Sequence, residues 1–342
     1  LFSLIMLVSM LFIGTANAET TAPSSYVIDG SKLHTIYGSS YLSGSQYIDI
    51  QFKKTTDGKI IYCIERSKAP IGSGTTEKYT LQKELSSKVA YVMENGYPNK
   101  SIFGNADKDY YTTGLAIWYV INPNDSTFEY FNLANGTYRG NSSDIVVEMA
   151  KLVNGANSYS YTNPSIKINN SNSNLSLSSD GKYYVSSSMG VKTTGTVGNY
   201  TVSLSNAPEG TIVTDTKGNA KTTFATNESF LVKVPVSNVK KISNEFQVNV
   251  SAKGTINKAY AYTSTRSNVQ NTGALYPENS NVNDSTTVKL NVVTVVEISK
   301  VDVTTGEELA GAHLELKDEK GNLIEAWVST NESHVIEGLA PG

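Results

Sequence analysis

The period of the apolar residues changes near Asn163, and this change limits what the chain can fold into. Beyond this point, apolar and polar residues alternate in short runs such as 200–204, 230–234 and 246–250. Turn residues such as Asp180-Gly181 separate these runs at short intervals. Short alternating segments with frequent turns are typical of a β-sandwich. The sequence therefore predicts a β-sandwich domain over residues 163–292.

Before residue 163 the pattern is mixed. Apolar and β-branched runs predict strands over residues 26–28, 47–52 and 60–64. Asp57-Gly58 is a hairpin turn signal between the last two. Cys63 would then lie on the second strand of this hairpin.

Three helices are predicted to follow. Thr80 can cap the first, which would end before Gly96. The second begins between residues 107 and 109 and stops at Asn122-Pro123. Ser142 or Ser143 caps the third, which Gly155 ends. Their apolar stripes, including Tyr110, Tyr111 and Trp118, are interpreted as core positions.

Residues 1–18 are apolar and uncharged and close with Ala16-Asn17-Ala18, a small-residue cleavage signature. This pattern predicts a secretory signal peptide with a truncated start. A membrane anchor is the alternative, but the apolar run is short for a span.

Composition excludes several classes of function. Charged residues make up 17% of the 342 residues and the net charge is −3, which argues against binding nucleic acid or a membrane surface through a basic face. Three scattered histidines give no ligand spacing for zinc, and no phosphate-binding loop is present, so we expect no metal, cofactor or enzymatic activity. A single cysteine in a secreted chain excludes an internal disulfide.

The final segment opens a third unit at residue 293. It contains Lys300-Val301-Asp302, then Thr305-Gly306-Glu307, and stops at a Gly-Leu-Ala-Pro-Gly turn ending at Gly342. It is too short to bury a sandwich core alone. The predicted fold is therefore mainly β and multidomain: an α+β domain over 19–162, a β-sandwich over 163–292, and the N-terminal half of a further β domain over 293–342.

Residues 26 to about 160 resemble the thioester domain of Gram-positive surface adhesins. The resemblance rests on Tyr62-Cys63-Ile64, on the segment from Leu85 to Pro98, and on residues 113–119, which begin Thr-Gly-Leu-Ala-Ile-Trp. In that family, the cysteine and a glutamine form an internal thioester, which an amine of a host protein attacks. The resemblance implies that Cys63 is the thioester cysteine, and that Tyr110, Tyr111 and Trp118 help shield the bond from water.

Gly114 stands where the family motif has glutamine. A glycine has no side chain to donate an acyl group, and it also disfavours the middle of a helix by about 1 kcal/mol relative to alanine. The other glutamines (Gln46, Gln51, Gln82, Gln247 and Gln270) lie outside the motif. We therefore expect the thioester to be disabled and Cys63 to be a free thiol.

Residues 293–342 are similar to the first half of a Cna-B-like, pilin-type domain. That family joins a lysine to an asparagine in an isopeptide bond, and Lys300 matches the lysine. The matching asparagine and the assisting acid are expected beyond Gly342, together with any signal for attachment to the cell wall.

These resemblances imply a secreted adhesin of the cell surface or cell wall that binds a host or extracellular-matrix protein, with no obligate oligomer. The alternative is a stalk or pilin-like spacer with an inert thioester-type cap. An adhesin should keep a groove lined by the Cys63 region, whereas an inert cap should have that region filled. An extracellular hydrolase would need a catalytic cluster, and the sequence indicates none.

Overall fold

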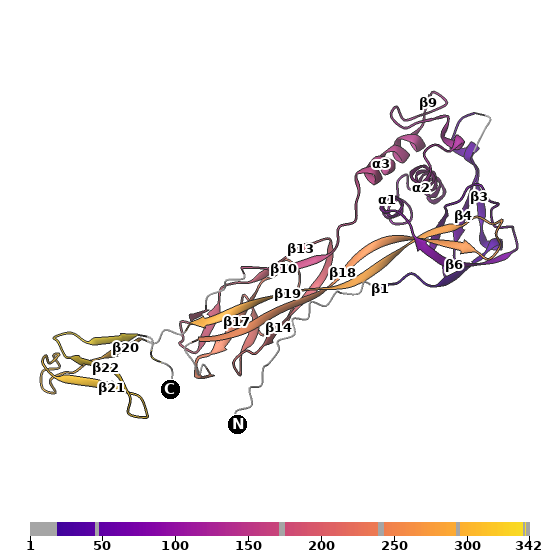
Figure 1. Cartoon of the computed structure of the whole chain (residues 1–342). Coiled ribbons are helices and arrows are strands. Elements are labelled where there is room, and N and C mark those ends of the chain that lie inside the picture. Colours follow the sequence, from indigo (N-terminus) through magenta and orange to yellow (C-terminus); the bar gives the residue numbers. More distant parts are fainter. Residues whose placement is uncertain are drawn as a thin grey trace. The chain divides into compact units, whose positions relative to one another are not determined.

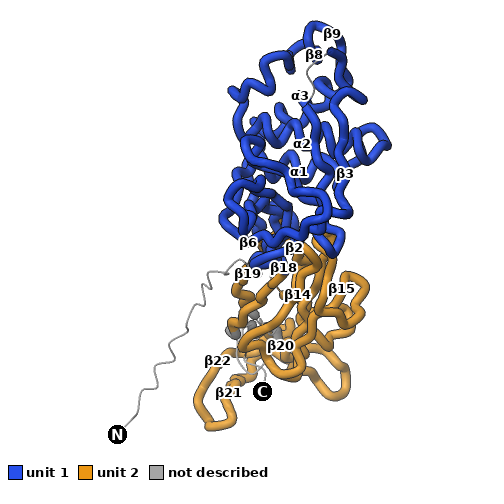
Figure 2. The backbone as a smooth tube through the Cα atoms, turned by 90° about the vertical axis from the view of Figure 1, so that its right-hand side faces the viewer, with its two compact units in different colours: residues 1–165, 194–197, 253–282 blue, residues 166–193, 198–252, 283–342 orange. Residues whose placement is uncertain are grey.

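The structure is a computed structural model, and it describes residues 19–44, 48–170, 175–238, 243–291, 295–337 and 339. The predicted signal peptide, residues 1–18, lies outside the described residues. The chain is mainly β, as predicted, and the described part holds three α-helices, all in the N-terminal unit. It divides into two compact units (Figure 2): residues 1–165, 194–197 and 253–282 form unit 1, and residues 166–193, 198–252 and 283–342 form unit 2.

The sheet of unit 1 begins with two antiparallel groups of strands. Strands β3 (His34–Ile36), β4 (Ile50–Lys54) and β5 (Ile60–Cys63) pair in chain order, and β2 (Ser25–Asp29) pairs with β6 (Thr76–Glu84). The β4–β5 hairpin opposes Lys53 to Ile61 across the turn at Asp57-Gly58. The predicted hairpin, with Cys63 at the end of its second strand, is confirmed.

Two long strands complete this sheet from far along the chain. They are β18 (Ser243–Ser264) and β19 (Thr272–Asn291). The C-terminal part of β18 pairs with β6, while the start of β19 pairs with β5 and its residues 278–279 pair with β1 (Glu19–Thr20). The division of the chain thus differs from the predicted one: residues 253–282 belong to unit 1, and within this range residues 260–264, 272–273 and 278–279 pair with N-terminal strands.

The helices of unit 1 are α1 (Ser87–Asn95), α2 (Ala106–Ile121) and α3 (Asp144–Ser158), and they lie together in Figure 1. The helix predicted to start at Thr80 is wrong over its first turns. Residues 76–84 form β6 instead, in which Glu77 and Tyr79 are buried alternately with exposed neighbours. The third helix also continues past Gly155 to Ser158.

Helix α2 forms the centre of the unit 1 core. Asn105 caps it by accepting a hydrogen bond from the Lys108 amide at 2.9 Å, and residues 109–118 are all buried. The Tyr110 ring stacks between Phe52 and Tyr62, with centroids 4.3 and 4.5 Å away. Its hydroxyl donates to the Ile61 carbonyl at 2.7 Å, so α2 is fixed against the β4–β5 hairpin. The predicted core role of Tyr110, Tyr111 and Trp118 is confirmed by their burial. A short three-stranded sheet between α2 and α3 consists of β7 (Phe131–Asn132), β8 (Thr137–Tyr138) and β9 (Asn141–Ser142).

Unit 2 contains the predicted sandwich. The strands of one sheet lie in the order β11 (Leu175–Leu177), β12 (Tyr183–Ser186), β17 (Phe230–Pro235) and β15 (Ile212–Asp215). The facing sheet contains β16 (Thr223–Phe224), β14 (Thr196–Ser205) and the first part of β18. In addition, β10 (Ser165–Asn169) pairs with β13 (Gly190–Thr194). Phe230 of the first sheet contacts Phe224 and Tyr200 of the second, with ring centroids 5.8 and 6.2 Å apart. All three side chains are buried, so they form the core between the sheets.

The last described residues form two small antiparallel pairs. Strand β20 (Val295–Ile298) pairs with β23 (His334–Glu337), and β21 (His313–Lys317) pairs with β22 (Leu323–Val328). Residues 283–342 are grouped with unit 2, so the division into compact units does not separate the predicted domain at 293–342.

Candidate functional site

Cys63 ends strand β5 inside the core of unit 1. It is a free cysteine, 4% exposed, and it lies opposite Thr272 of β19. Its backbone carbonyl accepts a hydrogen bond from the indole nitrogen of Trp118 on α2 at 2.7 Å. Burial raises the pKa of the Cys63 thiol, and the nearby positive charge of Lys53 opposes this increase. The thiol is therefore fixed in place and mostly protonated at neutral pH.

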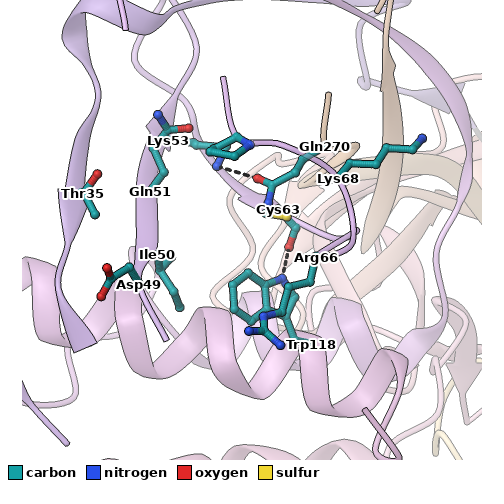
Figure 3. A pocket seen from close by; sticks show the side chains of 11 residues that line it. Thr35, Asp49, Ile50, Gln51, Lys53, Cys63, Arg66, Lys68, Trp118 and Gln270 are labelled. Atoms are coloured by element: carbon teal, nitrogen blue, oxygen red, sulfur yellow. Dashed lines mark hydrogen bonds between the residues drawn. The ribbon is translucent and has the colours of Figure 1, made fainter. Parts of the chain in front are cut away.

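Gln270 reaches the same place from the segment that precedes β19. The backbone amide of Gln270 donates to the Ala69 carbonyl at 2.9 Å, and its backbone carbonyl accepts from the Tyr79 hydroxyl at 3.0 Å. The next residue, Asn271, accepts from the Ile64 amide at 3.0 Å. These backbone contacts hold the 269–272 segment alongside residues 63–69. The Gln270 side chain is 8% exposed and lies beside Cys63 in Figure 3.

Lys53 contributes a buried cation to this cluster. It lies on β4, is 1% exposed, and donates from Nζ to Oε1 of Gln270 at 3.2 Å. Its backbone amide donates to the Tyr110 hydroxyl at 3.2 Å. Burial lowers the pKa of Lys53 to about 8, and the proximity of Cys63 partly offsets this effect. At pH 7 the side chain is therefore mainly an ammonium group in a desolvated site.

Cys63, Lys53 and Gln270 line one pocket of about 250 Å³ (Figure 3). Asp49, Ile50, Gln51 and Thr35 form part of its wall, and Arg66, Lys68, Pro70 and Trp118 form the rest. The region around Cys63 is thus hollow and not filled. This is the arrangement that the sequence analysis expects of a protein that retains a binding role.

The structure does not place position 114 at this pocket. Gly114 lies on α2, where an added Cβ atom would be 3.3 Å from Ile50 Cδ1 and 3.8 Å from Tyr62 Cδ1. Gln270 is one of two glutamines that line the pocket together with Cys63. The assignment of the donor position to Gly114 stays a prediction, and a side chain there would first meet Ile50, which itself lines the pocket.

Sequence reasoning missed both Gln270 and Lys53. Gln270 is separated from Cys63 by roughly 200 residues and falls in the stretch that was predicted to be sandwich. Lys53 is one of two adjacent lysines that directly follow the strand predicted over residues 47–52, and Lys54 is exposed. The alternation of a strand is the only local signal that could have separated the two.

Gln51 is a second glutamine at the pocket. Its Nε2 donates to the Ile71 carbonyl at 2.9 Å, so its amide group is held by another part of the chain. It is the natural comparison for Gln270 in any experiment on the donor.

Lys300 lies far along the chain, in unit 2. Its backbone amide donates to a Glu308 carboxylate oxygen at 3.0 Å, and its carbonyl accepts from the Leu309 amide at 2.7 Å. The side chain is partly exposed. Its role in an isopeptide bond stays a prediction.

The described part of the chain has neither a candidate metal site nor a candidate membrane-spanning helix. It contains no group of three or more His, Cys, Asp or Glu side chains arranged to hold a metal ion. No helix within it is both long and apolar enough to cross a membrane.

Comparisons with solved structures show which proteins have a fold similar to that of this chain. The Bacillus anthracis TIE protein has a similar structure, with 23% identity and a TM-score of 0.67 over 96% of this chain and 58% of that one. The thioester domain of the Enterococcus faecium TIE86 protein has 19% identity and a TM-score of 0.52 over 80% of this chain and 99% of that one. This chain thus spans less than two thirds of the Bacillus anthracis chain. No curated protein matches the sequence.

The match to a sequence family is local. Residues 60–167 match the family described as the thioester domain. This range contains Cys63 and all three helices, and it stops well before Gln270. Residues 60–167 thus match the thioester domain family, and the two solved structures have a fold similar to that of this chain.

Proposed function

We propose that this chain is a bacterial surface adhesin that captures a host or extracellular-matrix protein through an internal thioester between Cys63 and Gln270. One observation carries the proposal: in a chain whose residues 60–167 match the thioester domain family, the single cysteine and a buried glutamine line the same pocket. Secretion and attachment to the cell surface belong to this proposal.

The chemistry has two steps. The Cys63 sulfur attacks the side-chain carbonyl carbon of Gln270, the amide nitrogen leaves as ammonia with the thiol proton, and a thioester forms. A primary amine of the partner then attacks the same carbonyl carbon. An amide bond joins the partner to Gln270, and Cys63 is released as a thiol.

The pocket suits such an acceptor. Its volume of about 250 Å³ is below the usual range for small-molecule sites, so a slender side chain ending in an amine fits it better than a bulky ligand. Lysine is the protein side chain of this shape. The inert-cap alternative requires this region to be filled, and it is open.

The intact mass of residues 19–342 tests the proposal. Wild-type protein should lack the mass of one ammonia, and methylamine should add its full mass and expose a thiol that reacts with iodoacetamide. Gln270→Ala and Cys63→Ala should not react with methylamine. Gln51→Ala, the matched control from the same pocket, should behave like wild type.

Two results would contradict the assignment. A wild-type protein with a reactive Cys63 thiol and no response to methylamine would show that the thioester is absent, as the sequence analysis expects. Loss of the methylamine reaction in Gln51→Ala, with retention in Gln270→Ala, would make Gln51 the donor.

A further inference from the structure

Lys53 is unusual because a buried charge normally has a partner of opposite sign. Lysine is rarely fully buried unless it is paired, since desolvating an ammonium group is costly. Among the described residues no carboxylate lies within ion-pair distance of Lys53, and its Nζ donates to the neutral Gln270 carbonyl oxygen at 3.2 Å. The cost of this burial points to a role for the charge at this position.

The other cations of the pocket are already paired. Arg66 lies 3.3 Å from the carboxylate of Asp125, and Lys68 lies 3.0 Å from that of Glu65. Both are also more exposed than Lys53, so water weakens their fields. Lys53 is thus the cation directed at the reacting carbonyl group (Figure 3).

The oxygen that Lys53 contacts is the atom on which negative charge develops. Attack by sulfur on the Gln270 carbonyl carbon gives a tetrahedral intermediate with an anionic Oε1, and attack by an amine on the thioester gives the same oxyanion. A charged donor fixed near this oxygen in a desolvated site stabilises both transition states. Strand β4 holds Lys53 in position, because the Lys53 backbone amide is hydrogen-bonded to the Tyr110 hydroxyl and the strand is paired with β5.

Resting on the proposed thioester, we propose that Lys53 is a catalytic residue whose ammonium group stabilises the oxyanion at Gln270 during both formation and aminolysis of the bond. No proton leaves Lys53 in either step. The thiol proton departs with ammonia on formation, and a proton of the attacking amine returns to Cys63 sulfur on aminolysis.

Lys53→Met tests this role, because methionine has a similar length and no charge. Lys54→Met is the matched control, since Lys54 is the next residue of β4 and is exposed. The bond is first opened with ammonium chloride, which regenerates the Gln270 amide and the Cys63 thiol. After the ammonium is removed, the return of the bond is followed by intact mass and by the loss of the free thiol.

Closure and methylamine opening should both be about a hundredfold slower in Lys53→Met than in Lys54→Met, as for removal of one oxyanion donor. Equal rates in the two variants would overturn the role of Lys53 and leave the thioester intact. A wild-type chain that never loses ammonia would overturn both proposals. A methylamine-resistant ammonia loss with a free Cys63 thiol would mean that Lys53 is itself the nucleophile, forming an amide with Gln270.

A second measurement covers the case in which Lys53→Met does not fold, as judged by circular dichroism. The wild-type opening rate, divided by the concentration of unprotonated methylamine, should fall as pH rises through about 8, where Lys53 loses its proton. The titratable groups facing Lys53 are Cys63 of β5, which is acylated before opening, and Tyr110 of α2, whose pKa burial raises well above this range. Asp49, Arg66 and Lys68 also line the pocket. A flat profile would overturn the proposal.

Discussion

Lys53 makes the site sensitive to pH at the scale of a single residue. Burial lowers its pKa from 10.5 to about 8, so between these values the unfolded chain binds a proton that the folded chain has released. Stability rises with pH wherever the unfolded state binds more protons. The charged form that favours catalysis therefore destabilises the fold, which is a common compromise at functional sites.

This linkage gives a prediction for a chain that has no thioester. In Cys63→Ala, the free energy of unfolding attributable to Lys53 should increase by about 2 kcal/mol between about pH 8 and about pH 9.5, at 1.36 kcal/mol per pKa unit. Urea unfolding is measured at each pH for the single variant Cys63→Ala and for the double variant Cys63→Ala with Lys53→Met. The difference between their free energies of unfolding is the contribution of Lys53, because the contributions of other titrating groups are the same in both. Parallel curves for the two variants would contradict the buried charge.

At the scale of the element, α2 serves the site as a support. Trp118 fixes the Cys63 carbonyl, Tyr110 fixes the hairpin, and residues 109–118 are buried throughout. Gly114 allows the helix to lie close to Ile50 and Tyr62. An added Cβ would require the end of the Ile50 side chain to shift by a few tenths of an ångström.

The substitution Gly114→Gln tests whether the acyl donor is Gln270 or, as the sequence motif indicates, the residue at position 114. Because position 114 faces Ile50 and Tyr62, a glutamine there should not act as donor, and Gln270→Ala with Gly114→Gln should stay inert to methylamine. The single variant Gly114→Gln should still lose one ammonia, provided that Ile50 yields to the added side chain. Intact mass measures both results. A thioester in the double variant would show that the residue at position 114 of α2 can act as the acyl donor.

At the scale of the whole chain, the proposed bond would join residues that are roughly 200 positions apart. It would tie β5 to the segment before β19, within unit 1. A cross-link stabilises mainly by restricting the unfolded chain, and the effect increases with the length of the closed loop. The bond would therefore act as a structural clamp as well as a reactive group.

Opening the bond with methylamine should lower the free energy of unfolding of unit 1 by up to about 5 kcal/mol, from the chain-entropy relation for a loop of this length. Denaturant unfolding before and after treatment measures the change. Cys63→Ala, treated identically, controls for effects of methylamine elsewhere. An unchanged unfolding midpoint in the wild type would exclude a clamp between Cys63 and Gln270.

Local patterns in the sequence determined much of the fold. The hairpin that ends at Cys63, the helix with Trp118 and the sandwich strands after residue 163 all depend on spacings of a few residues, so each could be predicted. The error at Thr80 arose where a strand carried an apolar pattern that also fits a helix. The resemblance to the thioester domain family was visible for the same reason, because its motifs are short and contiguous.

Only the tertiary structure decided which residues meet at Cys63. The Gln270 amide donates to the Ala69 carbonyl and its backbone carbonyl accepts from the Tyr79 hydroxyl, and these bonds depend on the return of β18 and β19 to the N-terminal sheet. Pairing between strands so distant in sequence has no local signal, since it is set by the burial of both partners in one core. The cysteine was thus evident from the sequence, whereas its proposed partner and the burial of Lys53 on β4 were evident only from the fold.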